Sequence, residues 1–96
     1  MQITVRIPSP LRPFSAGHGR VELTLAEGER ATVAAALAAL CQRYPGVGAR
    51  VLDEQGAVRE HVNVFLNGES IRALEGLASP LRGGDELAIL PAVSGG

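Results

Sequence analysis

Residues 32–44, Thr-Val-Ala-Ala-Ala-Leu-Ala-Ala-Leu-Cys-Gln-Arg-Tyr, predict the one main helix of this sequence. Thr32 suits the N-cap position, because its hydroxyl oxygen can accept a hydrogen bond from an N–H group of the first turn. The larger apolar residues that follow recur at intervals of four, three, one and three, which places them on one helix face: Val33, Leu37, Leu40, Cys41 and Tyr44. Pro45 and Gly46 end the pattern. We therefore expect an amphipathic helix with one buried face.

Two predicted β-strands precede this helix. Apolar and polar residues alternate over 2–7 and again over 21–25, the period of two that is typical of a strand with one buried face. Pro8 and Pro10 end the first strand, because proline cannot donate to a strand ladder. The Pro- and Gly-rich connection from Ser9 to Gly19 is long for a hairpin. The pattern predicts two strands of one hairpin with an extended loop between them.

The second half of the sequence predicts further strands. Residues 62–68 alternate in the same way and end in Asn-Gly, a strong tight-turn dipeptide. We expect a short edge strand at 71–74 and a closing strand at 85–91. The stretch 47–61 has no clear period, so it is interpreted as a connection with at most one helical turn at 48–52.

This order of elements predicts an α+β fold. Two hairpins that flank a single amphipathic helix must bury that helix on one face of a small sheet, since neither layer has another partner. The predicted layout is a single-domain β-grasp over residues 1–90, with a mixed four- to five-stranded sheet and the first and last strands side by side in its centre. Alternation places five residues under the helix, namely Val62, Val64, Leu66, Leu87 and Ile89. It leaves Phe65 and Leu90 on the opposite face.

Composition excludes several classes of function. Ninety-six residues suffice for one domain with its own core, and a net charge of −1 without charge runs gives no footprint for nucleic acid or an anionic membrane. No apolar stretch has the length of a signal peptide or a membrane span, so a cytoplasmic protein is expected. The single cysteine, Cys41, excludes an internal disulfide and is interpreted as a small core residue. His18 and His61 lack the spacing of metal ligands, so no metal site is expected.

The last six residues, 91–96, are predicted to form a flexible tail that leaves the folded body. They end in Gly95-Gly96, whose lack of Cβ atoms gives the narrowest backbone available. Six extended residues reach at most about 20 Å, enough to bring a terminal carboxylate into an enzyme's active site while the body stays outside. The reactive group predicted for this sequence is therefore the carboxylate of Gly96.

The element order, the segments 62–68 and 81–87 and the ending 89–96 together resemble the ubiquitin-like sulfur carriers, the MoaD and ThiS group. The ending Leu-Pro-Ala-Val-Ser-Gly-Gly looks most like the CysO-type carriers of cysteine synthesis, and much like MoaD, the small subunit of molybdopterin synthase. The ThiS carriers of thiamin synthesis are shorter and lack room for the two long connections, 9–19 and 47–61. Cysteine or another sulfur-containing metabolite is therefore the first interpretation, and molybdopterin the second.

This resemblance implies a role as a protein co-substrate and not as an enzyme. An E1-like adenylating enzyme of the MoeB/ThiF kind would use ATP to activate Gly96, and a sulfur donor would convert it to a thiocarboxylate. A sulfur-accepting synthase would then consume that sulfur, and the carrier itself would bind no cofactor. The residues expected to be gripped by these partners are Pro91, Ala92, Val93, Ser94 and Gly95.

A docking surface is expected on the sheet face opposite the helix. Phe65 and Leu90, joined by Leu74 or Leu81, would form an exposed apolar patch of the kind that marks partner sites. The alternative is that the connection 9–19 covers them. Two other functions stay open: a ubiquitin-like modifier joined to target lysines through Gly96, and a small interaction domain whose Gly-Gly ending has no role.

Overall fold

A computed structural model describes residues 1–26 and 31–91 of the chain. The expected tail residues 92–96, Gly95 and Gly96 among them, therefore lie outside the described residues. The side chain of Pro91 is likewise not described.

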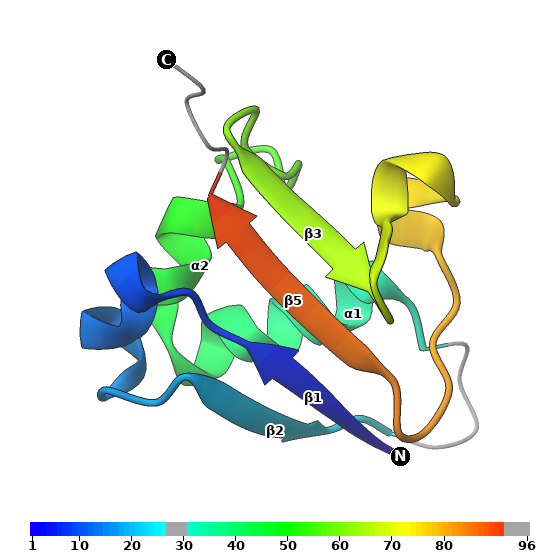
Figure 1. Cartoon of the computed structure of the whole chain (residues 1–96), viewed down its shortest axis with the longest axis horizontal. Helices are drawn as coiled ribbons and strands as arrows, with labels where there is room; N and C mark the ends of the chain where they lie inside the picture. The colour runs from blue at the N-terminus through cyan, green and yellow to red at the C-terminus, as the bar shows by residue number, and fades with distance from the viewer. Residues whose placement is uncertain (27–30, 92–96) are drawn as a thin grey trace.

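Five strands form one mixed sheet (Figure 1), in the order β2-β1-β5-β3-β4. Their bounds are β1 Gln2–Arg6, β2 Arg20–Thr24, β3 Val62–Leu66, β4 Glu69–Ser70 and β5 Glu86–Pro91. β5 is parallel to β1 and antiparallel to β3, so the predicted central position of the first and last strands is confirmed. This is the β-grasp arrangement that the sequence predicts.

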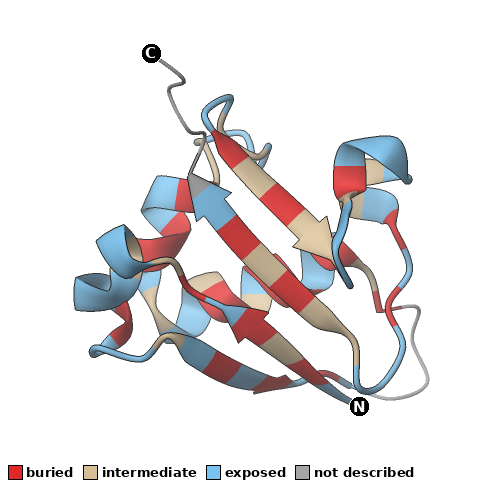
Figure 2. Ribbon diagram, in the orientation of Figure 1, coloured by how far each residue is buried: buried red, intermediate tan, exposed pale blue. Residues whose placement is uncertain are grey.

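Helix α1 (Val33–Arg43) packs behind the sheet and provides most of the helical core. Its N-cap is as predicted, since the backbone N–H of Ala35 donates to Oγ1 of Thr32 over 3.2 Å. Its buried residues are Val33, Ala36, Leu37 and Leu40, whereas Cys41 and Tyr44 are half-buried. Along the strands, buried and more exposed residues alternate (Figure 2). Four of the five side chains predicted to lie under the helix are buried, and Leu66 is half-buried against the same core.

The largest difference from the prediction is a second helix, α2 (Pro45–Val51), within what was interpreted as a connection. Pro45 does end α1, but it also occupies the start of α2, where a missing N–H costs nothing. Val47, Gly48 and Val51 are buried on this helix. The absence of a side chain at Gly48 allows α2 to approach α1 closely, because a Cβ atom there would lie 2.7 Å from Cβ of Cys41.

The connection between β1 and β2 is also ordered. It contains the 3-10 helix η1 (Ser9–Ser15), which ends at Ala16 in the left-handed region. Phe14 of η1 lies against α2, with the guanidinium carbon of Arg50 3.5 Å from its ring centre. The hydroxyl of the fully buried Ser15 donates to the carbonyl of His18 over 2.7 Å.

The edge strand was predicted too late in the chain. Asn67 and Gly68 both have positive φ, 49° and 87°, as the predicted tight turn requires. This turn places β4 at Glu69–Ser70, opposite Phe65 and Leu66. Residues 71–74 are not a strand: η2 (Ile71–Ala73) follows β4, and η3 is Gly76–Ala78.

Two residues near the ends of β5, Leu81 and Pro91, differ from the prediction. Leu81, considered for the exposed patch, is 5% exposed and belongs to the core; its N–H donates to the carbonyl of Ala31 over 2.9 Å. Pro91 does not leave the sheet, because it is the last residue of β5 and lies opposite Val62. The body therefore extends through position 91.

Candidate functional site

The sheet face opposite the helices is the candidate site, because β5 runs across it toward the C-terminus. The register places one row of outward residues across four strands: Arg20 on β2, Arg6 on β1, Ala88 on β5 and Phe65 on β3. The outer side chains of this row change from basic on one side to apolar on the other. The face therefore has a charged half and an apolar half that meet at β5.

Leu90 and Phe65 form the apolar half. Leu90 is 44% exposed, and it is the last outward residue of β5 before Pro91. Phe65 is half-buried, with Ala88 and Ser70 as its neighbours on the adjacent strands. Leu74 is 39% exposed but follows η2, beyond the edge strand β4. Leu90 lies opposite Asn63, whereas Phe65 lies opposite Ala88, two residues back along β5. The patch is therefore Leu90 at the end of β5 with Phe65 diagonal to it, and the connection 9–19 does not bury Leu90.

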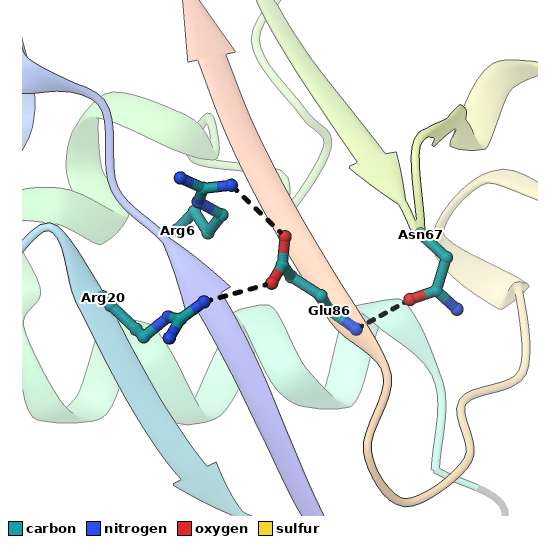
Figure 3. Close-up of polar contacts among 4 residues, drawn as sticks. All are labelled: Arg6, Arg20, Asn67 and Glu86. Carbon is teal, nitrogen blue, oxygen red and sulfur yellow. Dashed lines mark hydrogen bonds and ion pairs between the residues drawn. The ribbon is translucent and has the colours of Figure 1, made fainter.

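A cluster of three charged residues forms the other half (Figure 3). The carboxylate of Glu86 lies between two guanidinium groups, 3.7 Å from Nη1 of Arg6 and 3.6 Å from Nη2 of Arg20. Both arginine side chains are well exposed and the Glu86 side chain is partly exposed, so the pairs add little to stability. They do hold both arginines on this face, and two cations against one anion leave the cluster with a net positive charge.

The same Glu86 fixes the start of β5 through its backbone. Its N–H donates to Oδ1 of Asn67 over 2.9 Å, and its carbonyl accepts from the N–H of Asn67 over 2.9 Å. Asp85 closes the turn before β5: one carboxylate oxygen accepts from the N–H of Arg82 and the other from Nδ2 of Asn67. The tight turn after β3 is thus attached to β5.

A shallow hollow of about 370 Å³ adjoins the patch where β5 ends. Its wall contains Leu90, Arg6 and Arg12, and Nε of Arg12 is held by a hydrogen bond of 3.1 Å to the carbonyl of Ile7. Arg6, Arg12, Arg20 and Glu86 were not among the site residues predicted from the sequence. Alternation along each strand would have placed Arg6 and Glu86 on outward positions, but their pairing depends on the β1–β5 register.

Cys41, interpreted as a small core residue, is not among the buried core residues. It is half-buried where α1 meets α2, and burial raises the pKa of its thiol above the ordinary value. A raised pKa lowers the fraction of thiolate, the nucleophilic form, at neutral pH. This environment is that of an unreactive structural cysteine.

We expect Cys41→Ala to leave sulfur loading of the chain intact and to cost about 1 kcal/mol or less, because only one half-buried sulfur atom is removed. Because the pKa is raised, alkylation of Cys41 in the parent chain should accelerate only at a pH above that of an exposed cysteine peptide. Urea unfolding, intact mass and iodoacetamide kinetics check these points. Loss of loading in a folded Cys41→Ala protein would show instead that the thiol takes part.

Within residues 1–26 and 31–91, no three histidine, cysteine or acidic side chains are grouped so as to hold a metal ion. None of the helices in this described part of the chain is long and apolar enough to cross a membrane.

The fold and this face define a class, the ubiquitin-like β-grasp proteins, and comparison with known proteins defines the family. The ThiS family model matches residues 5–96. The sulfur carrier protein CysO of Mycobacterium tuberculosis is 38% identical over the full length of both chains. The chain therefore belongs to the ThiS family, and its predicted resemblance to the MoaD/ThiS-type sulfur carriers, near the CysO type, is confirmed.

Two solved structures are similar over nearly their whole length. SAMP1 from Haloferax volcanii superposes with a TM-score of 0.83 at 33% identity, covering 100% of both chains. The Amycolatopsis orientalis BexX/CysO complex contains a chain with a TM-score of 0.81 and 36% identity, covering 98% of this chain and 99% of that one. The family thus includes proteins named as sulfur carriers and a relative that is seen bound to another protein.

Proposed function

We propose that this protein is a sulfur carrier whose C-terminal Gly96 is converted to a thiocarboxylate for a biosynthetic enzyme, with cysteine or a related sulfur-containing metabolite as the product. The observation that carries this proposal is the full-length likeness to CysO in a chain whose last strand leads past an exposed apolar residue into the ending Pro-Ala-Val-Ser-Gly-Gly. The tail would then be the substrate and the sheet face its docking surface.

The chemistry explains why a partner with ATP is needed. At neutral pH a C-terminal carboxyl is ionised, and the carboxylate resists nucleophilic attack. Its oxygen would attack the α-phosphorus of ATP in an E1-like enzyme, forming an acyl adenylate and releasing pyrophosphate. A sulfur donor would then form a C–S bond to Gly96 while the C–O bond to AMP breaks.

The acceptor step completes the cycle. In a sulfur-accepting synthase the thiocarboxylate sulfur would attack an electrophilic carbon atom of the acceptor substrate. Hydrolysis of the resulting acyl–sulfur bond would then restore the carboxylate of Gly96. In this scheme ATP and all catalytic groups belong to the partners, the carrier holds no cofactor, and the cycle takes place in the cytoplasm. Molybdopterin synthesis stays the alternative destination of the sulfur.

Docking to the activating enzyme should depend on the patch. Leu90→Ala is expected to weaken binding severalfold with little change in stability. Only 44% of Leu90 is exposed, so covering it contributes roughly 1 kcal/mol, less than half of the value for a fully exposed leucine. Phe65→Ala should weaken binding similarly but also cost roughly 1 kcal/mol in unfolding, because the ring is already half-buried. Titration calorimetry and urea unfolding of each variant provide the measurements.

The matched control is Leu74→Ala, which removes the same side chain at a similar exposure, 39% against 44%. Leu74 lies outside the patch, so this variant should bind like the parent. Equal binding by the Leu90 and Leu74 variants would place the docking surface elsewhere on the molecule.

A second candidate function is protein modification, favoured by the likeness to SAMP1. The small archaeal modifier protein 1 of Haloferax volcanii is also 44% identical over 66 residues of this chain. Here the acyl adenylate of Gly96 would be attacked by a lysine amine of a target, forming an isopeptide and releasing AMP. The nine cationic side chains of this chain are all arginine, and guanidinium groups stay protonated and are not nucleophilic.

A modifier without lysine would attach to targets singly and would not build lysine-linked chains on itself. In cell extract with ATP and an E1-like enzyme, a tagged chain should therefore give thiocarboxylate by mass spectrometry and no ladder of self-conjugates on denaturing gels. Single isopeptides on other proteins, proven by target lysines that carry residues 83–96 after trypsin has cleaved at Arg82, would establish the modifier function beside or in place of the carrier function.

A further inference from the structure

The connection between β1 and β2 and the helix α2 form one structural unit beside the end of β5, which we call the shoulder (residues 8–19 and 45–51). Its two parts are in contact, because Arg50 of α2 stacks on the ring of Phe14 at 3.5 Å. Within α2, the same side chain donates to the carbonyl of Gly46 over 3.0 Å. A side chain at position 46 would press on Phe14, since a Cβ atom there would lie 3.1 Å from the ring. The shoulder is therefore a fixed surface and not a loose loop.

The shoulder forms part of the wall of two hollows at the end of β5, the one described above and a second one on the helix side. On the outer face, Pro8 and Arg12 form part of the wall of the hollow that includes Leu90. On the helix side, Leu11 and Arg50 border a second, more apolar hollow of about 170 Å³ that includes Ile89. A protein that receives the chain segment after β5 must therefore come close to the shoulder. In Figure 1, α2 and the blue helical segment after β1 lie beside the arrowhead of β5.

The charge of the shoulder is of one sign. Residues 8–19 contain Arg12 and His18 and no acidic residue, and residues 45–51 contain Arg50 and no acidic residue. The loop that leads into β3, on the other flank of the β5 end, differs: it carries Asp53, Glu54 and Glu60 beside a single arginine, Arg59. The end of β5 therefore lies between a basic flank and a mainly acidic flank.

We propose that the shoulder is a second docking surface, which meets an acidic rim beside the tail-binding channel of the E1-like activating enzyme. This inference rests on the proposed function. Protein interfaces commonly have an apolar centre and a polar rim, and here Leu90 and Phe65 supply the centre. Complementary rim charges accelerate association and fix orientation more than they add affinity. The difference in charge between the two flanks of the β5 end would thus fix the orientation in which the folded domain docks on the enzyme.

The test compares charge reversals that change the net charge equally. Arg12 and Arg50 lie on the shoulder, beside the end of β5, whereas Arg82 lies in the loop that precedes the start of β5; each is changed to Glu. The probe is the E1-like enzyme from the same genome. Its association rate with each variant is measured by stopped flow at low and high salt. Each shoulder variant should associate about fivefold more slowly at low salt, and within about twofold of the parent near 0.5 M salt. Arg82→Glu should match the parent throughout.

Conservative variants separate charge from structure. Arg12→Lys and Arg50→Lys keep the charge while losing the hydrogen bond of Arg12 to Ile7 and the stack of Arg50 on Phe14. They should associate like the parent, and their urea unfolding reports any loss of packing. If the lysine variants slow association as much as the glutamate variants, the shoulder acts only through folding and the proposal fails.

Sulfur loading followed by intact mass separates this inference from the proposed function. If the parent chain gains sulfur and the shoulder reversals associate as fast as Arg82→Glu, the acidic rim is wrong and the carrier function stands. If the parent chain neither binds the enzyme nor gains sulfur, both proposals fall together.

Discussion

Deletion of Gly96 is expected to abolish sulfur loading completely. The parent chain, incubated with an E1-like enzyme, ATP and a sulfur source, should exchange one oxygen for sulfur at its C-terminus. Without Gly96 the carboxylate would retract by one residue, about 3.5 Å for an extended chain, and would no longer reach the site of adenylation. Intact mass spectrometry and fragmentation locate the sulfur.

The control for this deletion is the stability of the body. Position 96 lies beyond β5, whose last residue is Pro91, and residues at a chain terminus outside the core contribute little to stability. The thermal melt of the shortened chain should therefore coincide with that of the parent. Extension of the chain by one residue after Gly96 should abolish loading equally. A shortened chain that still gains sulfur would refute the proposed reactive group.

Gly48→Ala is expected to destabilise the fold by about 1 to 3 kcal/mol, the usual range for overpacking a core. The new Cβ atom would lie 2.7 Å from Cβ of Cys41 and 3.0 Å from its Cα. The second of these is backbone, so a rotamer change of Cys41 cannot relieve it, and α2 must move away from α1. Urea unfolding of the variant measures the cost.

A control variant and a double variant show whether the helix contact causes that loss of stability. Gly83→Ala is the matched control, because a Cβ atom there would meet nothing nearer than Cβ of Met1 at 3.6 Å; we expect a change within about 0.5 kcal/mol. Adding Cys41→Ala to Gly48→Ala should recover only part of the stability, since the backbone contact persists. A Gly48→Ala protein as stable as the parent would mean that the two helices pack less closely than described.

Local sequence patterns determined the elements whose period and end signals agree. Residues 32–44 form α1 because an N-cap, an apolar stripe and Pro45 all specify the same helix. The alternation at 62–66 and the Asn67-Gly68 turn specify β3 and its hairpin, because positive φ at both turn positions suits few other residues. Burial of a single apolar face then required the sheet to lie on that helix, so the β-grasp was predictable without coordinates.

Local patterns failed where the determining contact is distant in the sequence. Helix α2 contains Pro45, Gly46 and Gly48, residues that usually interrupt helices, and it is stable because Val47 and Val51 are buried and Gly48 fits against Cys41. The strand expected at 71–74 was wrong because the tight turn had already fixed the two paired residues of β4. From the local sequence alone, Leu81 was a candidate for the exposed patch. It belongs to the core, and its backbone N–H donates to the carbonyl of Ala31.

In the candidate site, too, some features were determined by the sequence alone and others only by the tertiary structure. The Gly-Gly ending and the outward position of Leu90 follow from the sequence, because alternation along one strand sets which face a residue occupies. The grouping of Arg6, Arg20 and Glu86 depends on the register between β1, β2 and β5, and the basic shoulder depends on η1 packing against α2. Those contacts join residues far apart in the chain, so only the tertiary structure decided them.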